Sequence, residues 1–245
     1  MSRTITFILD DEVVEAQAGQ TILQAAVAAG KYIPRLCAQK GLSPHGSCRV
    51  CTVLVNGRPQ ASCTQPVAEG IVVVTDSPEL RELRKQIIEL LFVEGNHFCM
   101  FCEKSGNCEL QALAYRFGIT APRFPYQFPR RDVDATHPGL FLDRNRCILC
   151  ARCIRASKEL DGKNVFQFIG RGRDKRLGVN SRNGLGGTEA ETTDRAAEVC
   201  PVGALLRKRE GYRIPVGRRK YDLVPIGSEV EAGGIGAAGE GGQHE

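Results

Sequence analysis

Closely spaced cysteines constrain this chain more than any other feature of its sequence. Eleven occur in 245 residues, most of them in CxxC units. A CxxC unit places two thiolates on one tight turn, close enough to bind one metal centre. Disulfides would leave one of eleven thiols unpaired, so metal binding is the better interpretation. By position the cysteines form three sets, which are Cys37, Cys48, Cys51 and Cys63; Cys99, Cys102 and Cys108; and Cys147, Cys150, Cys153 and Cys200.

The composition indicates an ordinary soluble globular protein, with 42% hydrophobic and 25% charged residues. There is no run of about 18 apolar residues and no apolar signal core at the N-terminus, so we expect a cytoplasmic chain without a membrane span. Structural disulfides are rare in that compartment. The formal net charge is +5, but metal-bound thiolates would offset it. Because the basic residues are dispersed and Trp is absent, nucleic-acid binding is not expected.

The order of the expected elements predicts an α+β fold in three units. The first unit has strands around one short helix, which Thr21 and Gln24 begin as a capping box, and this order suits a β-grasp ferredoxin-type domain. The second unit is helical, with Pro78 in its first turn and leucines at helical spacing. The expected boundaries are 1–76, 77–120 and 140–210 for the three units, 121–139 for a connector rich in Pro and Arg, and 211–245 for a tail that lacks order in part.

Alternation and turn residues predict the individual elements. Asp10-Asp11 and Asn56-Gly57 are expected to form the turns between neighbouring strands. The Gly-rich stretch 183–187 is not a dinucleotide-binding fingerprint, because no strand leads into it and the glycine spacing differs. We expect strands over 3–9, 12–17, 49–55, 58–63, 71–75 and 165–169. We expect helices over 22–29, 78–93, up to about 117, shortly after the CxxCxxC run and near 194–199.

The first cysteine set has the spacing C-x10-C-x2-C-x11-C. A [2Fe–2S] cluster needs four thiolates on two irons, and plant-type ferredoxins supply them with a related pattern of one loop and a distant cysteine. Gly41 and Gly46 permit the tight wrapping of the backbone that such a loop requires. The set therefore favours a [2Fe–2S] cluster. A four-cysteine zinc site uses similar CxxC elements and is the alternative, together with buried free thiols.

The second set has three cysteines, one ligand short of the four that a cluster needs. His97 stands two residues before Cys99, and an imidazole can replace a thiolate, as it does in Rieske centres. A lone histidine more often has a surface or hydrogen-bonding role, but no free cysteine remains to complete this set. We therefore predict His97 as the fourth ligand. No role is assigned to the remaining histidines, which are His45, His137 and His244.

The third set combines a CxxCxxC run with a later CP dipeptide, Cys200-Pro201. The run wraps three corners of a [4Fe–4S] cubane, and the CP dipeptide is a signature of bacterial ferredoxins. In two-cluster ferredoxins a cysteine four residues after the run binds the other cluster, but here that position is Ser157. Zinc rarely uses CxxCxxC. We therefore expect a single [4Fe–4S] cluster in this unit, completed by Cys200.

Taken together, these motifs resemble the N-terminal iron–sulfur region shared by the large cluster-bearing subunit of respiratory complex I, iron-only hydrogenases and NAD-linked formate dehydrogenases. The chain is most similar to the family of small diaphorase subunits of NAD-reducing [NiFe] hydrogenases, over about residues 3–223. The EGNH…CELQ and RFPY blocks are specific, whereas CxxC alone would not be. The stretches that carry the resemblance are YIPRLC (32–37), SCRVC (47–51), EGNHFCMFCEKSGNCELQ (94–111), RFPYQFP (123–129), DRNRCILCARC (143–153), CPVG (200–203) and GRRKY (217–221).

The resemblance implies three clusters. In the complex I relatives the histidine lies four residues before the first cysteine, where this chain has Gly95, so we expect this loop to fold differently. Some hydrogenase relatives carry a further CxxCxxCxxxCP set, which this chain lacks. The implied ligands are Cys37, Cys48, Cys51 and Cys63 for a [2Fe–2S] cluster; His97, Cys99, Cys102 and Cys108 for a [4Fe–4S] cluster; and Cys147, Cys150, Cys153 and Cys200 for a second [4Fe–4S] cluster.

The resemblance also implies an electron relay within a hetero-oligomer. Single electrons would pass between a flavin- and NAD-binding diaphorase subunit and the small and large subunits of a [NiFe] hydrogenase. FMN, NAD and the Ni–Fe centre are expected on those partners. We identify no catalytic acid, base or nucleophile and no flavin or NAD site on this chain. The alternatives are the same relay in an NAD-linked formate dehydrogenase or a complex I-like oxidoreductase, and a non-redox zinc scaffold.

Overall fold

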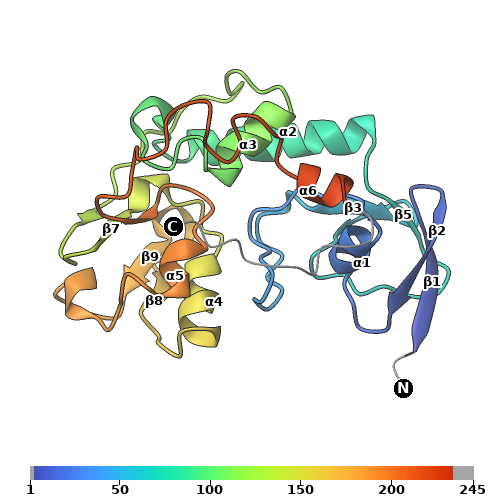
Figure 1. Ribbon diagram of the computed structural model, residues 1–245, viewed down its shortest axis with the longest axis horizontal. Coiled ribbons are helices and arrows are strands. Elements are labelled where there is room, and N and C mark those ends of the chain that lie inside the picture. Colours follow the sequence, from blue (N-terminus) through green and yellow to red (C-terminus); the bar gives the residue numbers. More distant parts are fainter. Residues whose placement is uncertain (1–2, 234–245) are drawn as a thin grey trace.

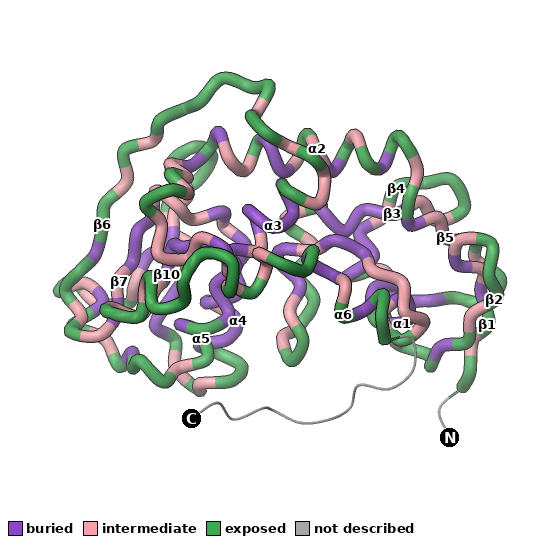
Figure 2. The backbone as a smooth tube through the Cα atoms, turned by 45° about the horizontal axis from the view of Figure 1, so that its top comes forward, coloured by how far each residue is buried: buried purple, intermediate pink, exposed green. Residues whose placement is uncertain are grey.

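The computed structural model describes residues 3–233. Figure 1 shows two compact lobes at opposite ends, formed by residues 4–74 and 133–207, with helix α2 (Pro78–Val93) running across between them. In Figure 2 the buried residues lie in the interior of both lobes and along helix α3 (Glu109–Arg116). Among the described residues, no helix combines the length and the apolar character that a membrane crossing needs.

The first lobe is a mixed sheet with one helix. Its elements are β1 (Thr4–Leu9), β2 (Glu12–Gln17), α1 (Ile22–Ala28), β3 (Thr52–Val55), β4 (Arg58–Ala61) and β5 (Val72–Val74). The strand order is β2-β1-β5-β3-β4, and only the β1–β5 pair is parallel within the described residues. The turn residues Asp10, Asp11, Asn56 and Gly57 all have positive φ, as type I′ hairpin turns require.

A capping box begins helix α1, as the sequence predicts. Thr21 Oγ1 accepts a hydrogen bond from Gln24 N at 3.3 Å, and Gln24 Oε1 accepts one from Thr21 N at 2.8 Å. Both otherwise unpaired backbone donors are thus satisfied at the start of the helix. The buried residues Ile22, Ala25 and Ala26 then join the core of the first lobe. The loop that follows α1 carries the first three cysteines of the chain.

Helix α2 is anchored to the first lobe and to the connector. The buried side chain of Arg84 donates hydrogen bonds from Nη2 to Thr52 O at 2.8 Å and to Thr75 O at 2.7 Å. Buried Glu89 accepts two hydrogen bonds of 2.9 Å from Nε of Arg123 in the connector. Because these contacts come from one helix, α2 sets the position of the connector relative to the first lobe.

The second lobe is built from short strands and helices. Its elements are β6 (Val133–Asp134), β7 (Leu140–Asp143), α4 (Arg152–Glu159), β8 (Phe166–Ile169), β9 (Arg176–Val179), α5 (Arg195–Glu198) and β10 (Leu205–Arg207). They form the sheets β10-β7-β6 and β8-β9, both antiparallel. The sequence predicts α4, β8 and α5 but not β6, β7, β9 or β10. These strands have two to four residues, and pairing across the lobe rather than local pattern decides them.

The first part of the expected tail, up to residue 233, has a defined structure. Helix α6 (Ser228–Glu231) packs beside α3, where Arg116 donates a hydrogen bond to Ile226 O at 2.8 Å and forms an ion pair with Glu231. Tyr221 N also donates to Gly106 O at 2.9 Å. These contacts stabilise residues 221–231, for which the sequence predicts no helix or strand. The disorder expected for residues 234–245 lies outside the described residues.

Candidate metal centres

The four cysteines of the first set come together beside helix α1. Cys37 N donates to Cys48 Sγ at 3.4 Å. Hydrogen bonds from the thiols of Cys48 and Cys63 lower the pKa of the Cys37 thiol. A hydrogen bond from Cys63 lowers the pKa of Cys51 to about 6. The same bonds raise the pKa values of the donors Cys48 and Cys63. Each thiol therefore lies within hydrogen-bonding reach of another member of the set.

The backbone of two cysteine loops takes conformations that most residues avoid. Arg49, directly after Cys48, has a φ of 60°, and Leu149 and Ala151, on either side of Cys150, have φ values of 53° and 58°. Each such residue costs about 1–3 kcal/mol and persists only where the surrounding structure over-determines it. Strained non-glycine residues beside the cysteines indicate that these loops are shaped to hold the thiols.

The three cysteines of the second set are also neighbours. Burial raises the pKa of the Cys99 thiol, and nearby Cys102 raises it further. Burial also raises the pKa of Cys108 to about 12, with smaller contributions from both other thiols. Arg146, from the second lobe, donates from Nη1 to Cys102 Sγ at 3.7 Å. Cys108 is buried and the other two cysteines are partly buried, so thiolates here would need a positive charge to stabilise them.

His97 presents an unpaired ring nitrogen in the same region. Its Nε2 atom is buried and has no hydrogen-bond partner among the described residues. Burial, and then the charge of Arg146, lower the pKa of His97 to about 4, so the imidazole is neutral at pH 7. A neutral imidazole with a free ring nitrogen is the form that binds metals. The ring packs edge-on against Phe92, with centroids 5.4 Å apart.

The imidazole ring of His97 lies close to the backbone of Gly95. A Cβ atom on Gly95 would lie 2.5 Å from His97 Nε2 and 2.9 Å from Asn145 O. The imidazole of His97 thus occupies the space into which a side chain at position 95 would project. The sequence predicts a different fold for this loop because the histidine is displaced by two residues.

The third set lines one small cavity inside the second lobe. All four of its cysteines contribute to the wall, and the other wall residues are apolar, among them Phe168 and Leu177. Burial raises the pKa of Cys147 to about 11 and of Cys150 to about 12, and it raises that of Cys153 well above its ordinary value. Thiolates in such a cavity are stable only beside a positive group, and an iron–sulfur core supplies one.

Ser157 has a structural role at the position where a two-cluster ferredoxin has a cysteine. It is buried, donates from Oγ to Lys163 O at 3.0 Å and accepts from Val165 N at 3.2 Å. The hydroxyl therefore joins helix α4 to the loop that leads into β8. A single cluster in the second lobe stays a prediction.

The third set adjoins both of the others. Arg155 of α4 donates from Nη2 to Cys37 O at 2.5 Å and to Cys150 O at 3.5 Å, so one guanidinium touches both the first and the third loop. On the opposite side, Glu109 N donates to Pro201 O at 2.8 Å. These two residues directly follow the last cysteines of the second and third sets. The third set thus lies between the first and the second.

The sequence does not indicate the roles of several residues at these contacts. Arg152, which is 2% exposed, binds Glu109 through two hydrogen bonds of 2.7 Å. A Cβ on Gly203 would lie only 2.5 Å from Cys102 Sγ. The only signal for the arginines is their interleaving with the cysteines in the run RNRCILCARCIR (144–155). That interleaving does not show which loops they join.

Three family models match the chain in order. Their descriptions are "2Fe-2S iron-sulfur cluster binding domain" for residues 2–78, "NADH-ubiquinone oxidoreductase-G iron-sulfur binding region" for residues 84–123, and "NADH-quinone oxidoreductase subunit 3, ferredoxin-like domain" for residues 138–206. Each matched region contains one of the three cysteine sets. The chain is therefore built from iron–sulfur domains of mixed α and β structure.

The gamma subunit of NAD-reducing hydrogenase HoxS from Cupriavidus necator is 40% identical over 224 residues, which cover 91% of this chain and 95% of that protein. The chain belongs to the family of these hydrogenase gamma subunits. A chain in the crystal structure of NAD+-reducing [NiFe]-hydrogenase in the H2-reduced state is 51% identical, with a TM-score of 0.88. The match covers 90% of this chain and 94% of that chain. The family that the motifs indicate is thereby confirmed.

A longer relative belongs to complex I. The 78 kDa subunit of mitochondrial NADH-ubiquinone oxidoreductase from Candida albicans is 35% identical over 209 residues. The match covers 84% of this chain but only 29% of that subunit. The chain thus spans under a third of this relative, and the likeness concerns the iron–sulfur region alone.

Proposed function

We propose that this chain is the electron relay of an NAD-reducing [NiFe] hydrogenase. It passes single electrons between a flavin- and NAD-binding diaphorase subunit and the small and large hydrogenase subunits, in the reaction H2 + NAD+ = H+ + NADH. FMN, NAD and the Ni–Fe centre belong to those partners in this proposal. The family membership and the near-complete coverage of the Cupriavidus necator gamma subunit support it.

The contact of the third set with both others is the observation that carries the relay. An electron carrier needs redox centres in a chain, and the three cysteine sets are arranged in the order first, third, second. The joining contacts are direct: Arg155 touches the loops of Cys37 and Cys150, and Glu109 binds Pro201. We infer that electrons cross this subunit through the third site, in either direction.

The proposed ligands follow the three sets. Iron–sulfur clusters at these sites would supply one-electron chemistry, and the protein holds the thiolates, excludes water and supplies hydrogen bonds to them. No three His, Cys, Asp or Glu side chains among the described residues are grouped tightly enough for a single metal ion. The proposed sites are Cys37, Cys48, Cys51 and Cys63 for [2Fe–2S]; His97, Cys99, Cys102 and Cys108 for [4Fe–4S]; and Cys147, Cys150, Cys153 and Cys200 for [4Fe–4S].

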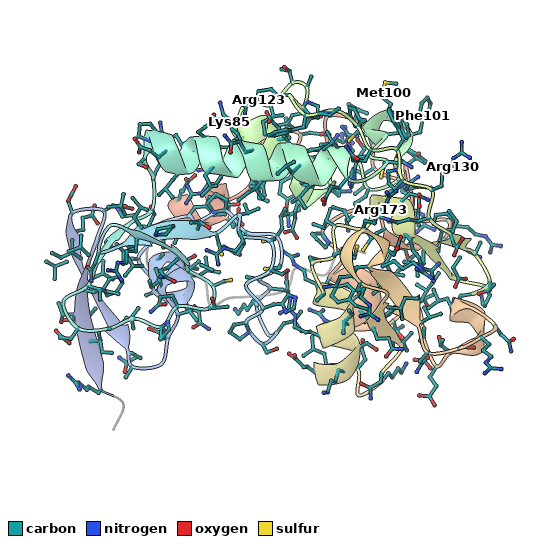
Figure 3. All side chains as sticks on the ribbon, turned by 180° about the vertical axis from the view of Figure 1, so that it is seen from behind. Lys85, Met100, Phe101, Arg123, Arg130 and Arg173 are labelled. Carbon is teal, nitrogen blue, oxygen red and sulfur yellow. The ribbon has the colours of Figure 1, made fainter. Side chains whose placement is uncertain are left out.

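Exposed apolar side chains surround the second site. Phe98, Met100 and Phe101 are 62%, 85% and 71% exposed and alternate with the ligands Cys99 and Cys102. Figure 3 shows Met100 and Phe101 pointing away from the protein beside one end of helix α2. Large apolar residues gathered on a surface mark interaction sites. We therefore place a partner subunit on this face, where it would shield the second site from water.

Iron and sulfide analysis tests the relay against a zinc scaffold. The full chain, purified without oxygen, should contain about ten iron atoms and about ten acid-labile sulfides, the sum of one [2Fe–2S] and two [4Fe–4S] clusters. Purification from its source should also yield nickel-containing partner subunits. Zinc without sulfide would contradict the relay, and a molybdopterin-containing partner would point to a formate dehydrogenase.

Replacement of Gly203 with alanine should damage the second site, although position 203 follows the CP dipeptide of the third. The new Cβ would lie 2.5 Å from Cys102 Sγ, and contacts under 3.0 Å force one group to move. We expect G203A to weaken or remove the [4Fe–4S] paramagnetic resonance signal of the second site and to retain the third. G233A, whose nearest contact is 3.2 Å, is the control. An intact second signal in G203A would show that Cys102 is not a ligand in this position.

A further inference from the structure

Arg155 is a buried arginine without an acidic partner. Its residue is 8% exposed, and among residues 3–233 it forms no ion pair within 4.0 Å, although exposed Glu159 feels its charge from further away. A buried charge without a counter-charge is strongly unfavourable. Other buried arginines have a carboxylate within that distance; these pairs are Arg84 with Asp76, Arg144 with Asp134, and Arg152 with Glu109.

The hydrogen-bond partners of Arg155 are backbone carbonyls of the two adjoining cysteine loops. Nη2 donates to Cys37 O at 2.5 Å and to Cys150 O at 3.5 Å, Nη1 donates to Ser43 O, and Nε donates to Ala151 O at 3.3 Å. Carbonyl oxygens satisfy the donors but carry no net charge. The acidic group whose charge bears on Arg155 is Glu159, but Glu159 is exposed, so water screens much of that charge. Negative charge in the space between the first and third sets would compensate Arg155 more fully.

Clusters at these two sites would supply that charge. An oxidised core of charge about +2 held by four thiolates is about −2 overall, and reduction adds one more negative charge. A guanidinium between the two sites favours the more negative, reduced form of each cluster. Its fork of donors also fixes the spacing of the two loops, because it binds both at once.

We propose that Arg155 is a positioning residue shared by the first and third clusters, which joins their ligand loops and raises the reduction potential of both. This inference rests on the proposed function, because it needs clusters at both sites. The second site has no contact with Arg155 among the described residues and serves as an internal reference.

The decisive variant is Arg155→Gln, which keeps amide donors but removes the charge. In the purified holoprotein, a redox titration followed by electron paramagnetic resonance should show both clusters with lower midpoint potentials. We expect the ratio of reduced to oxidised cluster at a fixed potential to fall about tenfold, which is about 59 mV for a one-electron couple. The potential of the second cluster should stay unchanged.

Two further variants separate charge from packing. R155K retains the charge and should keep both potentials close to those of the wild type, even if the loops are less firmly joined. Glu159 binds Ser43 N at 2.8 Å across the same contact but is exposed, so E159Q removes a charge that water already screens and should shift neither potential.

The outcomes distinguish this inference from the proposed function. If the wild-type protein lacks the paramagnetic resonance signals of the first and third clusters, the proposed function fails. If wild type has them and R155Q titrates at unchanged potentials, or only one cluster shifts, the shared role of Arg155 is wrong. If R155Q does not assemble its clusters, R155K decides. Wild-type midpoint potentials in R155K support the inference, whereas midpoint potentials about 59 mV lower in R155K overturn it.

Discussion

Replacement of Cys200 with serine is expected to remove the third cluster and stop electron flow through the complex. Cys200 is the one proposed ligand of its set that lies outside the CxxCxxC run, so the run alone would offer a cubane only three corners. Loss of an outer hydrogen-bond partner typically costs about 10–100-fold in metal affinity or activity, and loss of a ligand should cost more. Because the third site lies between the other two, its loss interrupts the relay.

The measurement is the rate of NAD reduction by hydrogen in the purified complex, together with low-temperature paramagnetic resonance. In C200S the rate should fall by more than about 100-fold, while the [2Fe–2S] signal persists. C63S is the matched variant: it should remove the [2Fe–2S] signal and retain the third cluster. A third cluster that survives intact in C200S would show that the pairing of Cys200 with Cys147, Cys150 and Cys153 is wrong.

Replacement of His97 with alanine is expected to weaken or remove the [4Fe–4S] signal of the second site. Three cysteines remain there, and the buried Nε2 atom of His97 has no other partner among the described residues. Its lowered pKa of about 4 keeps the ring neutral and able to bind iron at pH 7. The [2Fe–2S] signal should remain, because Cys37, Cys48, Cys51 and Cys63 belong to the first lobe, which does not contain His97.

A cysteine at the same position tests the ligand more sharply. H97C should restore the cluster but lower its midpoint potential, because histidine in place of cysteine raises the potential of a cluster. H45A, at an exposed histidine outside the second site, should leave the second cluster unchanged. Survival of all three clusters in H97A with unchanged potentials would rule out His97 as a ligand.

Local features of the fold could be predicted because short-range physics decides them. Helix α2 spans Pro78–Val93 and strand β2 spans Glu12–Gln17, as the sequence predicts. The capping box at Thr21 and the turn at Asn56-Gly57 depend on neighbouring residues alone. In contrast, β6 and β10 have two and three residues, too few for a pattern, and form only because β7 lies between them.

The candidate sites divide in the same way. The grouping of the cysteines, the missing fourth ligand of the second set and the family resemblance are all visible in the chain, because ligands of one cluster are mostly close in sequence. The sequence does not show which cysteine sets lie next to each other, because the residues that join them are far apart in the chain. Arg155 and Cys37, for example, are 118 positions apart. The structure alone shows that His97 fills the space above Gly95 and that Gly203 leaves room for Cys102.

The sequence thus determines which residues can hold metal, because a tight turn is enough to place two thiols together. Only the tertiary structure decides the order of the sites and the charges around them. Packing of α4 against the first lobe places Arg155 between two cysteine loops and leaves its charge without a carboxylate. Such an arrangement depends on contacts between distant segments, and cysteine spacing carries no information about it.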